Sequence, residues 1–227
     1  MKKTILAIAC ALALAGCGGM SEEQRLSTYV QGYLDLTYKD QINDDFLEIA
    51  GISEEEAEQQ YQDGLDVEVQ FFIDGIATIE YPTEEIETAI RDMYEEIYSH
   101  SSYTVGAASE LDSGNYAVEV KVQPIDIMTN FTPEDFQNVF TQVLAERGVT
   151  DNFALYSMSE EEYASADQEY ANRLVAMIEE KIPSIGYTEE KSLAVQIMDG
   201  GDMWEPNQDD FSQLDTWMID YSTFGYE

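Results

Sequence analysis

The apolar residues of this 227-residue chain change from helical to strand-like spacing at about residue 100, and that change restricts the folds open to the chain. Up to residue 98 they recur every three or four positions, which is the period of an amphipathic helix. From Tyr103 they alternate with smaller or polar residues, which is the period of a strand with one face in water. Helical spacing then returns between and after the strands. Because strands and helices do not alternate regularly, the pattern predicts an α+β fold with an antiparallel sheet.

Several predicted helices begin with a capping signal. Three are capping boxes, in which a Ser side chain and a Glu or Gln side chain three residues later each bond the other residue's backbone N–H. Thr132 is a fourth N-cap, and Pro133 follows it at the first helical position. Proline is favourable there because the N–H that it lacks would have no partner within the helix. Further helices are expected after Thr83 and, as short segments, near residues 46–49 and 211–218. The three box pairs are Ser21 with Gln24, Ser53 with Glu56, and Ser159 with Glu162.

A first β-hairpin is predicted around the turn Asp-Ser-Gly-Asn at residues 112–115. Apolar and polar residues alternate on both sides of this turn. Pro124 cannot donate to a strand ladder, so it should end the second strand. If Val120 belongs to the core, its replacement by Asp should destabilise the fold by several kcal/mol. The alternating apolar residues are Tyr103, Val105, Ala107, Tyr116, Val118, Val120 and Val122.

A second hairpin is predicted near the C-terminus. Residues 193–197 alternate again, and the turn Asp-Gly-Gly-Asp at residues 199–202 leads to Met203 and Trp204. Two hairpins supply four strands, enough for a sheet with one covered face. We therefore expect amphipathic helices packed on one face of a small antiparallel sheet made of two hairpins.

The first 20 residues have the layout of an exported precursor. Lys2 and Lys3 precede an apolar run that is too short for the roughly 20 residues of a membrane-spanning helix. The run ends in Leu-Ala-Gly-Cys at residues 14–17, which resembles the lipobox of bacterial lipoproteins. That resemblance implies cleavage before Cys17 and attachment of acyl chains such as palmitate to its sulfur and new amino group. The alternative is an ordinary secretory signal in which the cysteine has no role.

This interpretation divides the chain into three parts. Residues 1–16 would be the signal peptide, residues 17–20 the lipidated cysteine with a short tether, and residues 21–227 a single α+β domain. The domain would be held by its acyl chains on the extracytoplasmic face of the cell membrane. The alternative division separates a helical half before about Ser99 from a mixed half after it.

The charge of the chain excludes some classes of partner. Its formal net charge is −37, and loss of the two lysines with the signal peptide would make it −39. Nucleic acids and anionic membrane surfaces carry the same sign, so binding to nucleic acid is not expected. Cationic peptides, basic protein faces and divalent cations have the opposite sign. Once cleaved, the chain would keep Cys17 as its only cysteine, which leaves no disulfide or thiolate metal site.

Few residues suggest chemistry. His100 is the only histidine, and it stands at the end of a predicted helix, where a cation-capable side chain is favourable without any catalytic role. Asp199 and Asp202 could offer oxygens to a hard cation such as calcium, but without the spacing of a calcium-binding loop. Aromatic residues near Trp204 and Trp217 would be the first place to look for a binding face. No cofactor motif and no catalytic set is present, and the oligomeric state is left open.

Longer segments carry a second resemblance. With the lipobox, residues 96–106, 115–127 and 199–204 resemble lipoproteins of gut clostridia that carry a domain of unknown function. Such domains look like helix-on-sheet folds of the cystatin-like or nuclear-transport-factor-like kind. The resemblance implies a docking surface or a pocket between helices and sheet, and it implies no catalytic residues.

Three functional hypotheses follow. The leading one is a non-enzymatic, lipid-anchored domain that binds a protein, a peptide or an envelope component. The second is binding of a small ligand or divalent cation in a pocket between helices and sheet. The third is a hydrolase with paired carboxylates, which are defined by distance in space. A contiguous exposed apolar patch would favour the first hypothesis, and an aromatic-lined cavity with convergent polar groups would favour the second.

Overall fold

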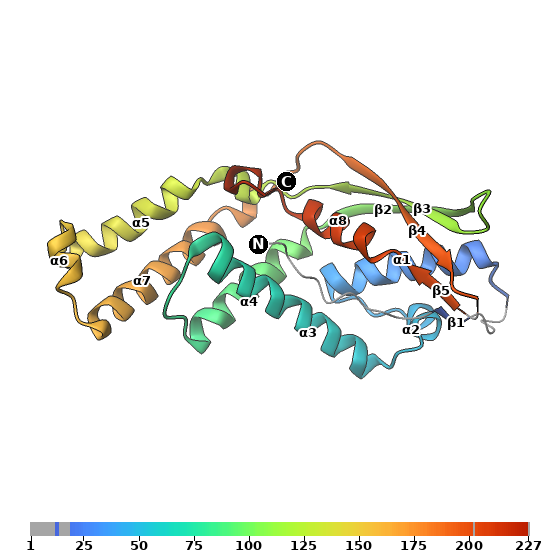
Figure 1. Ribbon diagram of the computed structural model, residues 1–227, viewed down its shortest axis with the longest axis horizontal. Coiled ribbons are helices and arrows are strands. Elements are labelled where there is room, and N and C mark those ends of the chain that lie inside the picture. Colours follow the sequence, from blue (N-terminus) through green and yellow to red (C-terminus); the bar gives the residue numbers. More distant parts are fainter. Residues whose placement is uncertain (1–11, 14–18, 202, 227) are drawn as a thin grey trace.

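The computed structural model describes residues 12–13, 19–201 and 203–226. Cys17, Asp202 and most of the predicted signal peptide lie outside the described residues. In the part of the chain that is described, helices pack on one face of an antiparallel sheet, which confirms the predicted α+β fold (Figure 1).

The described part of the chain contains eight α-helices. All three predicted capping boxes are present, and so is the Thr132 cap with Pro133 in the first turn. None of the helices within the described ranges is both long and apolar enough to cross a membrane. In chain order the helices are α1 (Glu22–Lys39), α2 (Asp44–Ala50), α3 (Glu54–Phe71), α4 (Glu84–Ser99), α5 (Pro133–Glu146), α6 (Asn152–Tyr156), α7 (Glu160–Glu179) and α8 (Gln208–Met218).

Five strands of the described residues form one sheet: β1 (Leu12–Ala13), β2 (Ser102–Glu110), β3 (Tyr116–Gln123), β4 (Lys191–Asp199) and β5 (Met203–Pro206). Their order across the sheet is β1-β5-β4-β3-β2, and all neighbours are antiparallel. The two predicted hairpins supply β2–β3 and β4–β5. Strand β1 pairs with β5 and falls within the predicted signal peptide, so cleavage before Cys17 would remove it.

The covered face of the sheet is built mainly by β3 and β4. On β3, Val118, Val120 and Val122 are completely buried, whereas Glu119 between them is exposed. Val118 pairs with Val195 of β4 in the ladder. Helices α1 and α8 pack against this sheet. The alternation predicted for the second strand of the first hairpin is therefore confirmed, and β3 ends directly before Pro124 as expected.

The alternation predicted for β2 is wrong after Val105. A register shift between Val105 and Ala108 inserts a bulge, so Ala108 is buried and Ala107 is exposed. The backbone N–H of Ala108 donates a 2.8 Å hydrogen bond to Ser27 Oγ of α1. A bulge places an extra residue in one strand and reverses the faces beyond it. The contact with Ser27 holds the shifted strand against α1.

The helix that begins after the Ser53 cap ends in a π-helix. Helix α3 stops at Phe71, and the chain continues as η1 (Phe72–Ala77). The next residue, Thr78, has φ 56° and ψ 56°, the left-handed region. A π-helix turn is uncommon and frequently lies at a functional site. This segment forms one wall of the pocket described below.

Helices α5, α6 and α7 project as an arm at one end of the longest axis, and α1 begins at the opposite end (Figure 1). The short helix α6 at the tip of this arm was not predicted. Its Phe153 and Tyr156 are 82% and 86% exposed, the largest values among the large hydrophobic residues described. The remaining short turns are η2 (Ile127–Asn130), η3 (Ile182–Ser184) and η4 (Ser222–Phe224).

Candidate functional site

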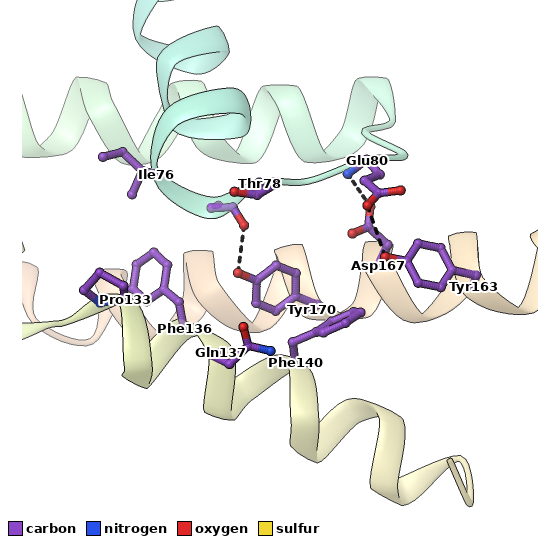
Figure 2. Close-up of a pocket in the computed structure, with 11 residues that line it drawn as sticks. Ile76, Thr78, Glu80, Pro133, Phe136, Gln137, Phe140, Tyr163, Asp167 and Tyr170 are labelled. Atoms are coloured by element: carbon purple, nitrogen blue, oxygen red, sulfur yellow. Dashed lines mark hydrogen bonds between the residues drawn. The ribbon is translucent and has the colours of Figure 1, made fainter. Parts of the chain in front are cut away.

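A pocket of about 360 Å³ lies where η1 and the following segment face α5 and α7 (Figure 2). We call it the α5–α7 pocket. Its volume is within the range of small-molecule sites. Four aromatic side chains from the two helices line it: Phe136, Phe140, Tyr163 and Tyr170.

Ring contacts hold the aromatic walls in place. The Phe140 ring lies 5.2 Å from that of Tyr170, at an interplanar angle of 67°, and 6.1 Å from that of Tyr163, at 74°. Edge-to-face pairs of this kind contribute roughly 0.5–1.5 kcal/mol beyond the burial of apolar area. Ion pairs also join the two helices, among them that of Arg147, the C-cap of α5, with Glu169 of α7, but both side chains are partly exposed, so the contribution is small. At the pocket itself, the aromatic rings of the two helices contact one another.

The segment that follows η1 forms the opposite wall. Tyr170 Oη donates a 2.8 Å hydrogen bond to the Ala77 carbonyl, which ties α7 to the end of η1 (Figure 2). Thr78, which lines the pocket, follows in the left-handed conformation. For a β-branched residue this conformation is strained. Backbone strain of this kind persists only where surrounding contacts impose it, and it clusters at binding sites.

Asp167 holds the chain two and three residues after Thr78. Its side chain is 2% exposed, and its Oδ2 accepts hydrogen bonds from the backbone N–H groups of Glu80 at 2.9 Å and Tyr81 at 2.7 Å. Burial raises the pKa of Asp167 above its ordinary value, the two backbone N–H groups act in the opposite direction, and the Glu80 carboxylate adds to the rise. Asp167 therefore fixes the path of the chain beside the pocket.

Glu80 and Tyr163 form the polar end of the pocket. Tyr163 Oη donates to Glu80 Oε1 at 3.3 Å, and Figure 2 shows both side chains gathered with Asp167 at one end of the aromatic wall. Burial, followed by the Glu80 carboxylate, raises the pKa of Tyr163 to about 12. Tyr163 therefore stays a neutral hydrogen-bond donor at physiological pH. Glu80 is exposed, so its carboxylate can meet a ligand.

The two tryptophans singled out from the sequence lie elsewhere. Trp204, on β5, is 7% exposed, and its ring packs edge-to-face on Tyr116 at 5.1 Å. Its Nε1–H donates to Glu22 Oε1 at 2.7 Å. Trp217, on α8, is half-buried, with Lys191 Nζ 5.5 Å from its ring centre. Trp204 therefore takes part in packing, and a binding face at Trp217 stays a prediction.

The structure gives Asp199 a local role. Its Oδ1 accepts from the Gly201 backbone N–H at 2.7 Å, which is a hydrogen bond within the turn that precedes β5. Asp202 lies outside the described residues, so the proposed cation site at Asp199 and Asp202 stays a prediction. Within the described ranges, no group of three His, Cys, Asp or Glu side chains is placed to hold a metal ion. His100 is exposed at the end of α4, and its carbonyl accepts from Tyr187 Oη at 2.8 Å.

Sequence reasoning missed the α5–α7 pocket because its walls are far apart in the chain. Asp167 and the backbone it binds are 86 and 87 residues apart. One signal was present: an aspartate lies within the apolar stripe of α7, between Ala166 and Tyr170. A carboxylate on a buried helix face needs hydrogen-bond partners, so its position indicates a polar site inside the fold.

Comparisons with known proteins define the fold but not a family. Neither a scan against protein-family models nor a search of curated proteins found a match. A crystal structure of a Bacillus subtilis protein, described as a "putative lipoprotein (ycdA)", has a similar fold, with a TM-score of 0.56 and 18% sequence identity. The alignment covers 87% of this chain and 57% of that one, so this chain spans little more than half of its length. At this identity the similarity shows a shared fold, and the cystatin-like, nuclear-transport-factor-like and clostridial relationships stay predictions.

Proposed function

We propose that this protein is a lipid-anchored, extracytoplasmic binding protein and that the α5–α7 pocket holds part of its ligand, a small molecule or a peptide segment. The observation that carries the proposal is the pocket itself. Four aromatic rings form its wall, and Glu80, Gln137 and Thr78 bring polar groups to it. Aromatic side chains together with a few placed polar groups are usual features of a ligand site.

Two observations support the anchor. Residues 14–17 resemble a lipobox, and the fold is similar to that of the Bacillus subtilis protein described as a "putative lipoprotein". Mass spectrometry of the protein extracted from membranes should find an N-terminal peptide that begins with acylated Cys17. A Cys17→Ala variant should be released from the membrane fraction. An intact leader, or an unmodified thiol at position 17, would overturn the anchor.

A binding role fits the site better than hydrolysis. Asp167 is almost completely buried, and its Oδ2 is occupied by two backbone N–H groups. A general acid or base must reach a substrate or a water molecule. The position of Asp167 instead serves to shape the wall of the pocket, which leaves Glu80 as the accessible carboxylate of the site.

The pocket can be tested by blocking it. Gln137 lines the pocket and is exposed, so Gln137→Trp should fill the opening without disturbing the core. Gln142→Trp is the matched control, because Gln142 is also exposed on α5 but does not line the pocket. Detergent-solubilised full-length protein would be immobilised and exposed to the peptides and metabolites of the culture medium. Compounds retained by the control and lost in Gln137→Trp would support the proposal, whereas identical retention by both variants would overturn it.

A second candidate function is docking to a protein, and the observation that favours it is the tip of the arm. Phe153 and Tyr156 are three residues apart on α6, so they share one face, and both are almost fully exposed. Acidic residues begin the next helix, α7, at Glu160. The partner would therefore offer an apolar recess with a basic rim. A photo-crosslinker at Tyr156 should join such a partner, and the yield should fall when Glu160 and Glu161 are changed to Lys.

A further inference from the structure

The charges around the α5–α7 pocket have one sign. Glu80 and Asp167 are the charged side chains that line it, and no Lys or Arg does so. An anionic ligand would therefore enter without a counter-ion, which is unfavourable in a partly dry site. A cationic ligand would meet Glu80, whose carboxylate is exposed and receives one long hydrogen bond from Tyr163.

The aromatic walls of the pocket also favour a cationic ligand. The faces of aromatic rings carry partial negative charge and attract cations within about 6 Å of the ring centre. Phe136, Phe140, Tyr163 and Tyr170 all line the pocket. Several aromatic rings around one pocket are typical of the aromatic cages that recognise organic ammonium groups.

A metal ion fits these walls less well than an organic cation. Calcium takes six to eight oxygen ligands, and magnesium requires near-ideal octahedral geometry. The pocket has two carboxylates, and Oδ2 of Asp167 is occupied by backbone N–H groups. Aromatic carbon supplies no ligand to a hard cation. An alkylammonium group, in contrast, can contact ring faces and a single carboxylate at once.

We infer that the α5–α7 pocket binds an alkylammonium group, with the aromatic rings around its apolar part and Glu80 as its counter-ion. This inference rests on the proposed function, because it names the ligand chemistry of the same site. The group could belong to a lysine side chain of a peptide or to a free amine. The two sources share the chemistry that the pocket recognises.

Matched probes test the charge preference. The cationic probes are n-butylammonium and the tripeptide Gly-Lys-Gly with blocked termini, and the neutral probes are 1-butanol and the same tripeptide with norleucine in place of lysine. Binding to detergent-solubilised full-length protein would be measured by saturation-transfer NMR and titration. Each cationic probe should bind at least about tenfold more tightly than its neutral counterpart, and less tightly at high salt. Binding of both cations indicates that a free amine suffices, whereas binding of the peptide alone indicates a lysine side chain.

Three variants test whether the preference for cationic probes arises at Glu80 in the pocket. Glu80→Gln should remove most of the preference for the cationic probe and leave neutral probes unchanged. Glu84→Gln is the control, because Glu84 is an exposed residue of the first turn of α4 that does not line the pocket. Gln137→Trp should abolish binding of every probe. Equal binding of cationic and neutral probes, or a preference that survives Glu80→Gln, would overturn the inference.

The two proposals fail separately. If medium components are retained in a Gln137-dependent manner but no ammonium probe binds, the pocket is a ligand site of another chemistry and the inference is wrong. If ammonium probes bind in a Glu80-dependent manner but Gln137→Trp leaves retention from the medium unchanged, the ammonium site stands. The proposed physiological role of the pocket is then wrong.

Discussion

Tyr98 Oη donates a 2.7 Å hydrogen bond to Glu68 Oε1 inside the core, between α4 and α3. Glu68 is one of the few charged residues that the fold buries. A second pair repeats this chemistry, since Tyr38 Oη donates to the buried Asp215 Oδ1 at 3.1 Å. Burial, followed by the nearby carboxylates, raises the pKa of both tyrosines well above its ordinary value. The tyrosines therefore stay protonated and act as permanent donors to the buried acids.

Removal of the Tyr98 hydroxyl should destabilise the protein. Tyr98→Phe keeps the ring packing but takes a donor from a buried carboxylate, which should cost about 1.5–3 kcal/mol of unfolding free energy. Urea denaturation measures this loss. Tyr156→Phe is the control and should change stability by less than about 0.5 kcal/mol, because Tyr156 is 86% exposed. Equal stabilities of the two variants would contradict a structural role for the Tyr98–Glu68 bond.

Two helical glycines should respond in opposite directions to replacement by alanine. A methyl group at Gly32, in α1, would overlap the side chain of Phe46, which is completely buried. Gly32→Ala should therefore cost about 1–3 kcal/mol or more. A methyl group at Gly64, in α3, would meet no atom, so Gly64→Ala should stabilise the protein by roughly 0.5–1 kcal/mol. Thermal denaturation measures the stability of both variants. Stabilisation by Gly32→Ala would show that α1 and α2 pack less closely than described, and destabilisation by Gly64→Ala would contradict the prediction for α3.

Asp167 should give the protein a pH dependence of a particular sign. Burial raises the pKa of this carboxyl in the folded chain above its ordinary value of 3.8, so the folded state holds the proton more tightly than the unfolded state. Its contribution to stability is therefore complete below the unfolded-state pKa and is lost as pH rises through the folded-state pKa. Asparagine does not titrate, so the stability of wild type relative to Asp167→Asn should be greater at about pH 4 than at pH 7.

The unfolding free energies of wild type and Asp167→Asn must be subtracted from each other at each pH. Other carboxylates in both proteins change stability with pH in the opposite direction. Hydrogen bonds from Ser53 and Ser159 lower the pKa values of Glu56 and Glu162, so these caps lose their contribution on acidification. Chemical denaturation of wild type and Asp167→Asn at matched pH values cancels that background. A relative stability that rises from pH 4 to pH 7 would mean that hydrogen bonding to Asp167 outweighs its burial.

The strained backbone at Thr78 should be relieved by glycine. A residue with a Cβ in the left-handed region costs roughly 1–2 kcal/mol, part of which glycine loses again through its greater entropy in the unfolded chain. Thr78→Gly should therefore stabilise the protein by about 0.5–1 kcal/mol. Thr88→Gly, in the interior of α4, should destabilise it by about 0.3–0.5 kcal/mol. Urea denaturation distinguishes them, and a loss of stability in Thr78→Gly would show that the threonine side chain contributes contacts that outweigh the strain.

Local features of the fold could be predicted from the sequence because they depend on neighbouring residues. The Ser21 and Ser53 capping boxes require only a partner three residues later, and both are present. The alternation of β3 is likewise local, and Val118 to Val122 are buried as expected. The fold class follows from the order of such segments.

The features that escaped prediction depend on contacts between distant segments. The bulge in β2 is held by Ser27, which is 81 residues from Ala108. Helix α6 has only five residues, too few for a periodic pattern. The wall of the pocket depends on the hydrogen bond from the Glu80 backbone N–H to Asp167. A local sequence pattern does not predict which distant loop will bind a buried aspartate. Periodicity therefore identifies the elements, whereas the site arises from their packing.

The elongated arrangement of the helices has a consequence for encounters at the cell surface. Helix α1 begins at one end of the longest axis, and the arm of α5, α6 and α7 lies toward the other (Figure 1). If acyl chains hold residue 17 in the outer leaflet, the aromatic-walled cavity stands off from the lipid headgroups. The cavity could then contact solutes and neighbouring surfaces that a domain lying flat on the membrane would not reach.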